Sequence, residues 1–134
     1  MRAILDTDTL SEVLKGKNPL VRHRAREYRA DAGHFTISAV TVLEVVSGWR
    51  RVGKEEKVRH FVELLTSFEV LPLDEQIAEL AGRIEGDMFR VGQLVGRGDV
   101  MIAATAVFHR LPLVTGNTAH YERISALGFR LASP

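Results

Sequence analysis

The chain has 134 residues, of which 46% are hydrophobic and 26% charged, and its formal net charge is +1. This composition is typical of one soluble globular domain, and so small a net charge does not by itself indicate a nucleic-acid partner. The absence of cysteine excludes disulfides and thiolate metal sites and fits a reducing, cytoplasmic compartment. No hydrophobic run approaches the ~20 residues of a membrane span, and the first residues lack a signal-peptide pattern, so we expect no membrane association.

Short hydrophobic runs alternate with amphipathic stretches along the whole chain. We expect strands at 2–5, 35–38, 68–71, 113–115 and 129–132. We expect helices at 9–15, 20–30, 41–49, 55–66, about 75–89 with Asp74 as its cap, 99–110 and 121–127, with a flexible connection at 92–98. The alternation predicts a single α/β domain over residues 1–134, with a parallel sheet of four or five strands and helices on both faces.

Polar side chains occupy points where a strand would pass into a helix, or lie just inside the helix. Asp6 ends the first hydrophobic run, Glu44 interrupts the hydrophobic stretch 42–46, and Asp99 precedes the hydrophobic run 100–107. Asn117 follows the strand at 113–115. Because such junctions share one edge of a parallel sheet, we expect these groups to meet there. Carboxylates that meet repel one another, and a cation relieves that repulsion.

Each acid also has an ordinary structural explanation. Asp99 suits a helix N-cap, and Glu44 could reach back to Thr41 in a capping box. Asp6 and Asp8 could be turn residues that follow a strand. These explanations are less convincing together than singly, because the acids fall at equivalent places in the predicted fold. Glu44 also lies among branched hydrophobic residues, where burial without a partner is costly.

The ligand chemistry indicates the kind of cation. Oxygen ligands without cysteine favour Mg²⁺ or Mn²⁺ over zinc. In phosphodiester hydrolysis such an ion activates water, orients the scissile phosphate and stabilises the leaving oxygen. Two basic clusters, at 22–29 and 50–59, would suit a phosphate backbone, although solvated helix faces would give the same pattern.

Four segments, 4–12, 37–48, 98–106 and 113–117, resemble in order and spacing the motifs of PIN-domain ribonucleases, specifically the VapC-type toxins of bacterial and archaeal toxin–antitoxin pairs. The resemblance extends from end to end. It implies a three-layer α/β/α fold and Mg²⁺-dependent endonucleolytic cleavage of RNA, with Mn²⁺ as a possible substitute. It also implies a homodimer and a cognate antitoxin that blocks the site.

The resemblance further implies roles for individual residues. The catalytic positions correspond to Asp6, Glu44, Asp99 and Asn117. Asp6 and Asp99 correspond to the direct metal ligands, and Thr7 and Thr115 to hydroxyls that support the site.

Two positions depart from the family pattern. Asp8 stands where relatives usually have Asn, so it adds a charge or supports the site as an acceptor only. Asn117 replaces a fourth acid, and His120 stands where some relatives place that acid. A neutral amide weakens a second metal site, so we expect one-metal occupancy.

Two other functions remain open at this stage. In a phosphatase of the haloacid dehalogenase type, Asp6 would be phosphorylated and Asp8 would be the acid/base, but Asp99 has no acidic neighbour of the kind that family needs. A PIN-fold module that grips RNA or protein without cutting would be consistent with the missing fourth acid. The sequence does not identify the RNA target.

Overall fold

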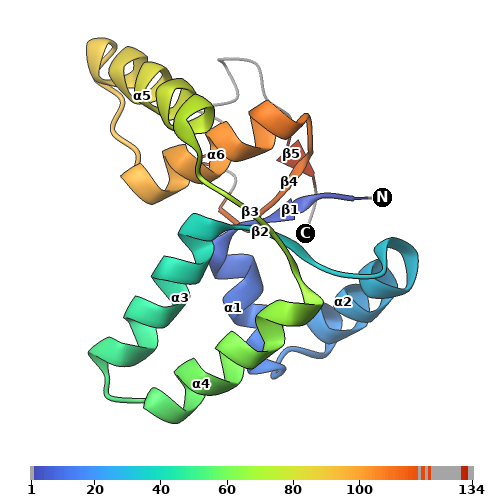
Figure 1. The fold of residues 1–134 in the computed structure, drawn as a ribbon. Helices are drawn as coiled ribbons and strands as arrows, with labels where there is room; N and C mark the ends of the chain where they lie inside the picture. The colour runs from blue at the N-terminus through green and yellow to red at the C-terminus, as the bar shows by residue number, and fades with distance from the viewer. Residues whose placement is uncertain (1, 118, 120, 122–130, 133–134) are drawn as a thin grey trace.

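The computed structural model describes residues 2–117, 119, 121 and 131–132, and it contains one parallel five-stranded sheet in the order β3-β2-β1-β4-β5 (Figure 1). The strands are β1 (Ile4–Leu5), β2 (Thr36–Ser38), β3 (Glu69–Leu71), β4 (Leu113–Val114) and β5 (Leu131–Ala132). The helices are α1 (Thr7–Lys15), α2 (Pro19–Ala32), α3 (Ala39–Arg51), α4 (Glu55–Leu64), α5 (Glu75–Arg90) and α6 (Arg97–His109), with a 3₁₀ turn, η1 (Leu65–Ser67). The predicted α/β class and parallel sheet are confirmed.

Most predicted elements are present, and their ends differ for local reasons. Asp74 caps α5 as predicted, because its Oδ1 accepts the amide of Ile77 at 2.9 Å. Helix α6 begins at Arg97, two residues earlier than expected, so the connection predicted at 92–98 is shorter. The helix predicted at 121–127 lies almost wholly outside the described residues, as does the start of the strand predicted at 129–132.

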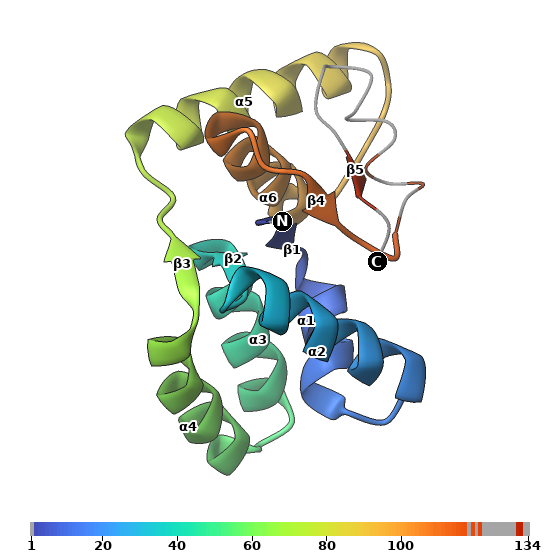
Figure 2. The ribbon, with the colours of Figure 1, turned by 90° about the vertical axis from the view of Figure 1, so that its right-hand side faces the viewer.

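The sheet separates two layers of helices, each with its own hydrophobic cluster (Figure 2). Ile4 packs with α5 and α6 on one face, whereas its neighbour Leu5 packs with α1 and α3 on the other. This alternation follows from the pleat, because successive side chains of a strand point to opposite faces. Both strand residues are buried, so β1 reads as continuously hydrophobic in the sequence. The predicted three layers are confirmed.

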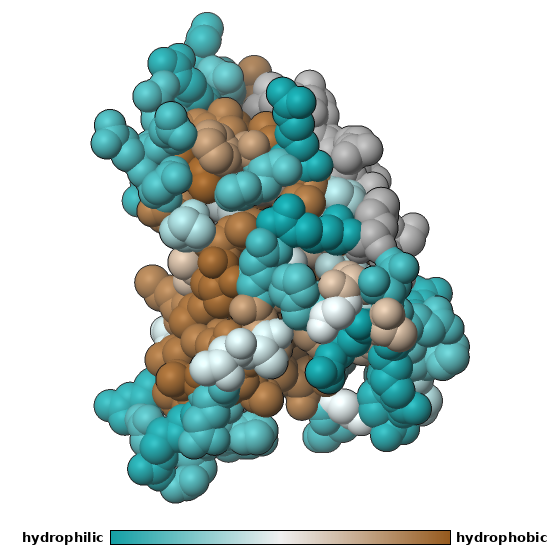
Figure 3. All heavy atoms as spheres, turned by 45° about the vertical axis from the view of Figure 1, so that its right-hand side comes forward, coloured by the Kyte–Doolittle hydropathy of each residue, from teal (hydrophilic) through white to brown (hydrophobic). Residues whose placement is uncertain are grey.

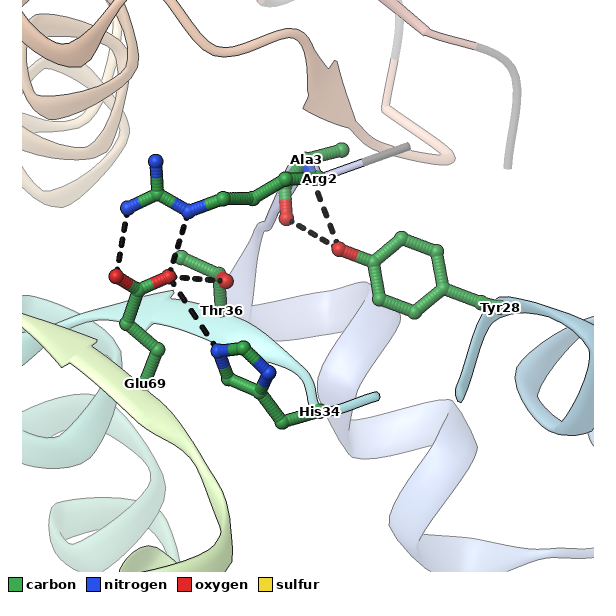
Figure 4. Close-up of polar contacts among 6 residues, drawn as sticks. All are labelled: Arg2, Ala3, Tyr28, His34, Thr36 and Glu69. Atoms are coloured by element: carbon green, nitrogen blue, oxygen red, sulfur yellow. Dashed lines mark hydrogen bonds and ion pairs between the residues drawn. The ribbon is translucent and has the colours of Figure 1, made fainter. Parts of the chain in front are cut away.

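The amino ends of β1, β2 and β3 are joined by polar contacts, shown in Figure 4. The Arg2 guanidinium donates two hydrogen bonds to the Glu69 carboxylate, at 2.7 and 2.6 Å, and the Thr36 hydroxyl donates a third at 2.8 Å. The Tyr28 hydroxyl ties α2 to β1 by accepting the amide of Ala3 and donating to its carbonyl, both at 2.9 Å. His34 Nε2 lies 3.7 Å from Oε1 of Glu69, and we call the six residues of Figure 4 the amino-end network.

No helix in the described part of the chain is both long enough and hydrophobic enough to cross a membrane.

Candidate active site

Asp6 is the buried acid at the carboxyl end of the central strand, with 3% of its surface exposed. It is the N-cap of α1, and its Oδ1 accepts the amide of Thr9 at 2.9 Å. Its Oδ2 accepts the hydroxyl of Thr115, beyond β4, at 2.5 Å. Asp6 is therefore a helix cap and not the turn residue that the structural explanation suggested, and capping uses only one of its two oxygens. The other joins two neighbouring strand ends.

Glu44 is held by a hydroxyl from another element and not by a capping box. Helix α3 begins at Ala39 with Ser38 as its cap, so Glu44 lies beyond the first turn. Its Oε1 accepts the hydroxyl of Thr7 at 2.5 Å. A carboxylate only accepts, so Thr7 uses its single proton here, and Thr41 must donate in the 3.1 Å contact between the two threonine hydroxyls.

Asp99 lies within the first turn of α6, whose N-cap is Gly96, so the N-cap explanation for Asp99 does not hold. Its Oδ1 accepts the hydroxyl of Tyr121 at 3.0 Å. Burial raises the pKa of Tyr121, and the nearby charges of Asp99, Asp6 and Glu44 raise it further. One phenol therefore lies within electrostatic reach of all three acids, which places them around one region at the carboxyl edge of the sheet.

Gly98 brings α6 against Glu44. A Cβ at this position would overlap Oε2 of Glu44 and would lie 3.1 Å from its carboxyl carbon. The backbone of α6 can therefore approach α3 this closely only because residue 98 has no side chain. Absence of a side chain at residue 98 thus allows the Glu44 carboxylate to lie beside the turn that carries Asp99.

The remaining predicted site residues contribute unequally. The backbone amide of Asn117 donates to the Thr115 hydroxyl at 2.9 Å, so Asn117 supports the residue that supports Asp6. Asp8 is exposed and lines a groove between α1 and α2. His120 lies outside the described residues. The structure therefore brings Asp6, Thr7, Glu44, Asp99 and Thr115 together and leaves Asp8 at the side.

The donor chemistry of this region suits a hard divalent cation. Within the described ranges, no three Asp, Glu or His side chains form a ready-made set of metal ligands. Mg²⁺ does not need one, since it binds through one or two carboxylates and keeps several waters. Each oxygen of Asp6 has one hydrogen-bond donor and retains a further acceptor site. Hydroxyl donors carry no charge, so they do not relieve the repulsion between carboxylates.

Sequence reasoning missed two residues of this site. Thr41 is fully buried and is the donor behind Thr7, although the sequence suggested a helix cap. Tyr121 is fully buried and follows the segment of Thr115 and Asn117 by a few residues. The available signal was the place of this tyrosine in the sequence, four residues after Asn117.

Over nearly its whole length the chain is similar to one family of known proteins. The family model of the PIN domain matches residues 3–126. A relative from Shigella flexneri, the tRNA(fMet)-specific endonuclease VapC, is 31% identical over 128 residues, covering 95% of each chain. Ribonuclease VapC10 of Mycobacterium tuberculosis is 34% identical over 134 residues, covering 98% of this chain and 94% of the relative.

Solved structures show the same fold. The chain in the crystal structure of DNA-bound VapBC from Salmonella typhimurium superposes with a TM-score of 0.84 at 31% identity, covering 99% of this chain and 98% of that chain. The crystal structure of FitAcB from Neisseria gonorrhoeae gives a TM-score of 0.79 at 26% identity, with 98% and 97% covered.

Proposed function

Because this chain belongs to the PIN domain family and its relatives are VapC ribonucleases, we propose that it is the toxin of a toxin–antitoxin pair and cleaves RNA with Mg²⁺ or Mn²⁺. The observation that carries the proposal is the convergence of Asp6, Glu44 and Asp99 from three distant parts of the chain: Thr7, next to Asp6, donates to Glu44, and Glu44 lies against Gly98, next to Asp99. The phosphatase alternative is dropped, since the family match spans nearly the whole chain.

In the proposed reaction the protein's part is to hold the site carboxylates in a fixed orientation. Asp6 and Asp99 are the residues that would bind the cation, which when bound supplies positive charge to polarise a water and a phosphate oxygen. Thr115 holds Asp6, and Thr7 holds Glu44 next to α6. Asp6 is almost fully buried at a strand end, so its position is set by the packed core and not by a loop. Because Asn117 is neutral and replaces a fourth acid, a second cation would be held weakly, and we propose that one cation occupies the site.

The proposed RNA surface is a stripe on α2. Arg22, Arg26 and Arg29 are exposed, and their spacing of four and three residues puts them on one side of the helix. No ion pair to another described residue is found for any of the three. In the second basic cluster, by contrast, two of the five basic residues are paired within the cluster: Arg50 with Glu55, and Arg59 with Glu56. The α2 stripe is therefore the better surface for RNA phosphates.

The antitoxin is proposed to occupy the groove between α1 and α2. The groove has a volume of about 520 Å³ and is lined mainly by hydrophobic side chains, including Val13, Val21 and Ala25. It also reaches Gly116, next to Thr115, so an occupant would extend to the candidate site. We expect Leu20→Glu, an exposed change on the groove wall, to prevent protection by a co-expressed antitoxin while RNA cleavage persists.

A second copy of the chain is proposed to cover another hydrophobic surface. Figure 3 shows hydrophobic residues gathered between the α5–α6 layer and the α3–α4 layer. Leu43 on α3 is 67% exposed, and Val70 on the edge strand β3 is 37% exposed. Exposed side chains of this kind favour homodimerisation. Sedimentation of the protein with Val70→Lys should show a loss of dimer.

The function is tested by incubating the purified chain with total cellular RNA and Mg²⁺ or Mn²⁺. We expect discrete cuts that disappear with EDTA and with Asp99→Asn. Asp74→Asn is the matched control, since it removes one charge from an exposed cap at which Asn is equally suitable. Cuts that persist in EDTA would contradict the metal-dependent mechanism. A folded wild-type protein that binds RNA without cutting it would favour the non-cleaving module.

A further inference from the structure

The chain contains two tyrosines, and each hydroxyl has a specific partner. The Tyr28 hydroxyl binds the backbone of Ala3 in the amino-end network. The Tyr121 side chain is fully buried in the cluster that includes Ile4, and its hydroxyl donates to Asp99. Phenylalanine would fill the same space, and burying a hydroxyl is costly unless it is hydrogen-bonded. The hydroxyl therefore needs an explanation beyond packing.

The contacts of the three acids follow one pattern. Asp6 accepts the hydroxyl of Thr115, and Glu44 accepts the hydroxyl of Thr7. Asp99 accepts the hydroxyl of Tyr121. In each pair the donor and the acid come from different parts of the chain, at sequence separations of 109, 37 and 22 residues. Each carboxylate is thus oriented by a hydroxyl that the tertiary fold delivers.

We propose, on the basis of the proposed metal-dependent function, that Tyr121 is a positioning residue that holds one oxygen of Asp99 so that the carboxylate is oriented for a divalent cation. Groups that hydrogen-bond a metal ligand fix its orientation, and their loss typically weakens metal affinity 10- to 100-fold. The contact is specific, since the Tyr121 hydroxyl donates to Oδ1 of Asp99 at 3.0 Å.

The test compares Tyr121→Phe with Tyr28→Phe in the full chain. Each change removes one hydroxyl and keeps the ring, and only Tyr121 contacts a site acid. Mn²⁺ binding is measured without RNA, from the electron paramagnetic resonance signal of the free ion. Steady-state cleavage of one RNA oligonucleotide is measured in parallel, and thermal unfolding establishes that both variants are folded.

We expect Tyr121→Phe to weaken Mn²⁺ affinity about tenfold and to lower kcat with little change in KM for RNA. Tyr28→Phe should bind Mn²⁺ like the wild type. Equal Mn²⁺ affinity in wild type and folded Tyr121→Phe would overturn this inference and leave the proposed ribonuclease function intact, provided that the wild type cuts. A wild type that neither binds Mn²⁺ nor cuts would overturn both. Equal losses of affinity in the two variants would also overturn the inference, since they would indicate a general effect of losing a buried hydroxyl.

Discussion

The two ends of the parallel sheet both concentrate polar side chains, but they use charge in opposite ways. At the amino end, the Glu69 carboxylate is paired with the Arg2 guanidinium, and its pKa is lowered to about 2, chiefly by that hydrogen bond. At the carboxyl end, Asp6 and Glu44 accept hydrogen bonds from hydroxyls and a backbone amide, none of which is charged. A paired acid supports the fold, whereas Asp6 and Glu44, held by uncharged donors in the described part of the chain, keep capacity for a cation.

The largest expected effect tests the carboxyl end directly. Asp6→Asn should lower RNA cleavage by more than about a hundredfold, since it removes a proposed ligand and a negative charge. Asn is as good an N-cap as Asp, and the relief of repulsion offsets the lost hydrogen bond from Thr115, so the free energy of unfolding in EDTA should fall by less than about 1 kcal/mol. Cleavage assays and urea denaturation measure the two quantities. A marked loss of stability would contradict the distinction between the two ends.

The next effect separates geometry from charge. Gly98→Ala places a Cβ where the Glu44 carboxylate lies, and this flexible side chain must then leave Thr7. We expect cleavage to fall at least about tenfold, while stability changes by less than about 1 kcal/mol. Gly86→Ala in α5 is the matched control, because outside its own helix no atom of the described residues lies within 4 Å of where its Cβ would be. Wild-type cleavage in Gly98→Ala would show that the position of Glu44 is unimportant.

At the amino end, Glu69→Gln should lower the free energy of unfolding by about 1–2 kcal/mol at neutral pH, with cleavage retained. The folded pKa of Glu69 is about 2, against an ordinary value of 4.5. Its contribution is therefore fully present above about pH 4.5 and is lost as the pH falls toward 2. Denaturation of both proteins across this range should show their stability difference shrinking with acidity.

The matched control for that pH series is Glu79→Gln. Glu79 forms an exposed pair with Arg83 within α5, for which a cost below about 0.5 kcal/mol is expected. An equal loss in the two variants would show that the amino-end network is no more stabilising than a surface ion pair.

The smallest effect is that of Tyr28→Phe. The hydroxyl bridges the amide and the carbonyl of Ala3, so its loss should destabilise the protein by about 1 kcal/mol. Cleavage of the RNA oligonucleotide should be unchanged. Reduced cleavage at full stability would indicate that the amino end influences the site.

Much of the fold could be predicted from local patterns. The run that ends at Leu5 indicated a buried strand, and Asp74 indicated the start of a helix; both predictions are confirmed. The start of α6 was misplaced because Asp99 is also a good cap residue, so the pattern could not show that the helix begins at Arg97 with Gly96 as its N-cap. The hydrophobic run before Asp6 predicted that this acid lies at the end of β1, but the sequence did not show which oxygen each donor would bind.

By itself, then, the sequence determined the order of the elements and the residues available for chemistry at one sheet edge, because hydrophobic periodicity and strand ends are local properties. Only the tertiary structure decided which hydroxyl orients which acid. Tyr121 reaches Asp99, and Thr115 reaches Asp6, because packing of the strands and helices brings distant segments within hydrogen-bond distance. The structure also placed Asp8 on the groove side. Helix α1 begins at Thr7, so Asp8 lies about 200° around the helix axis from Asp6.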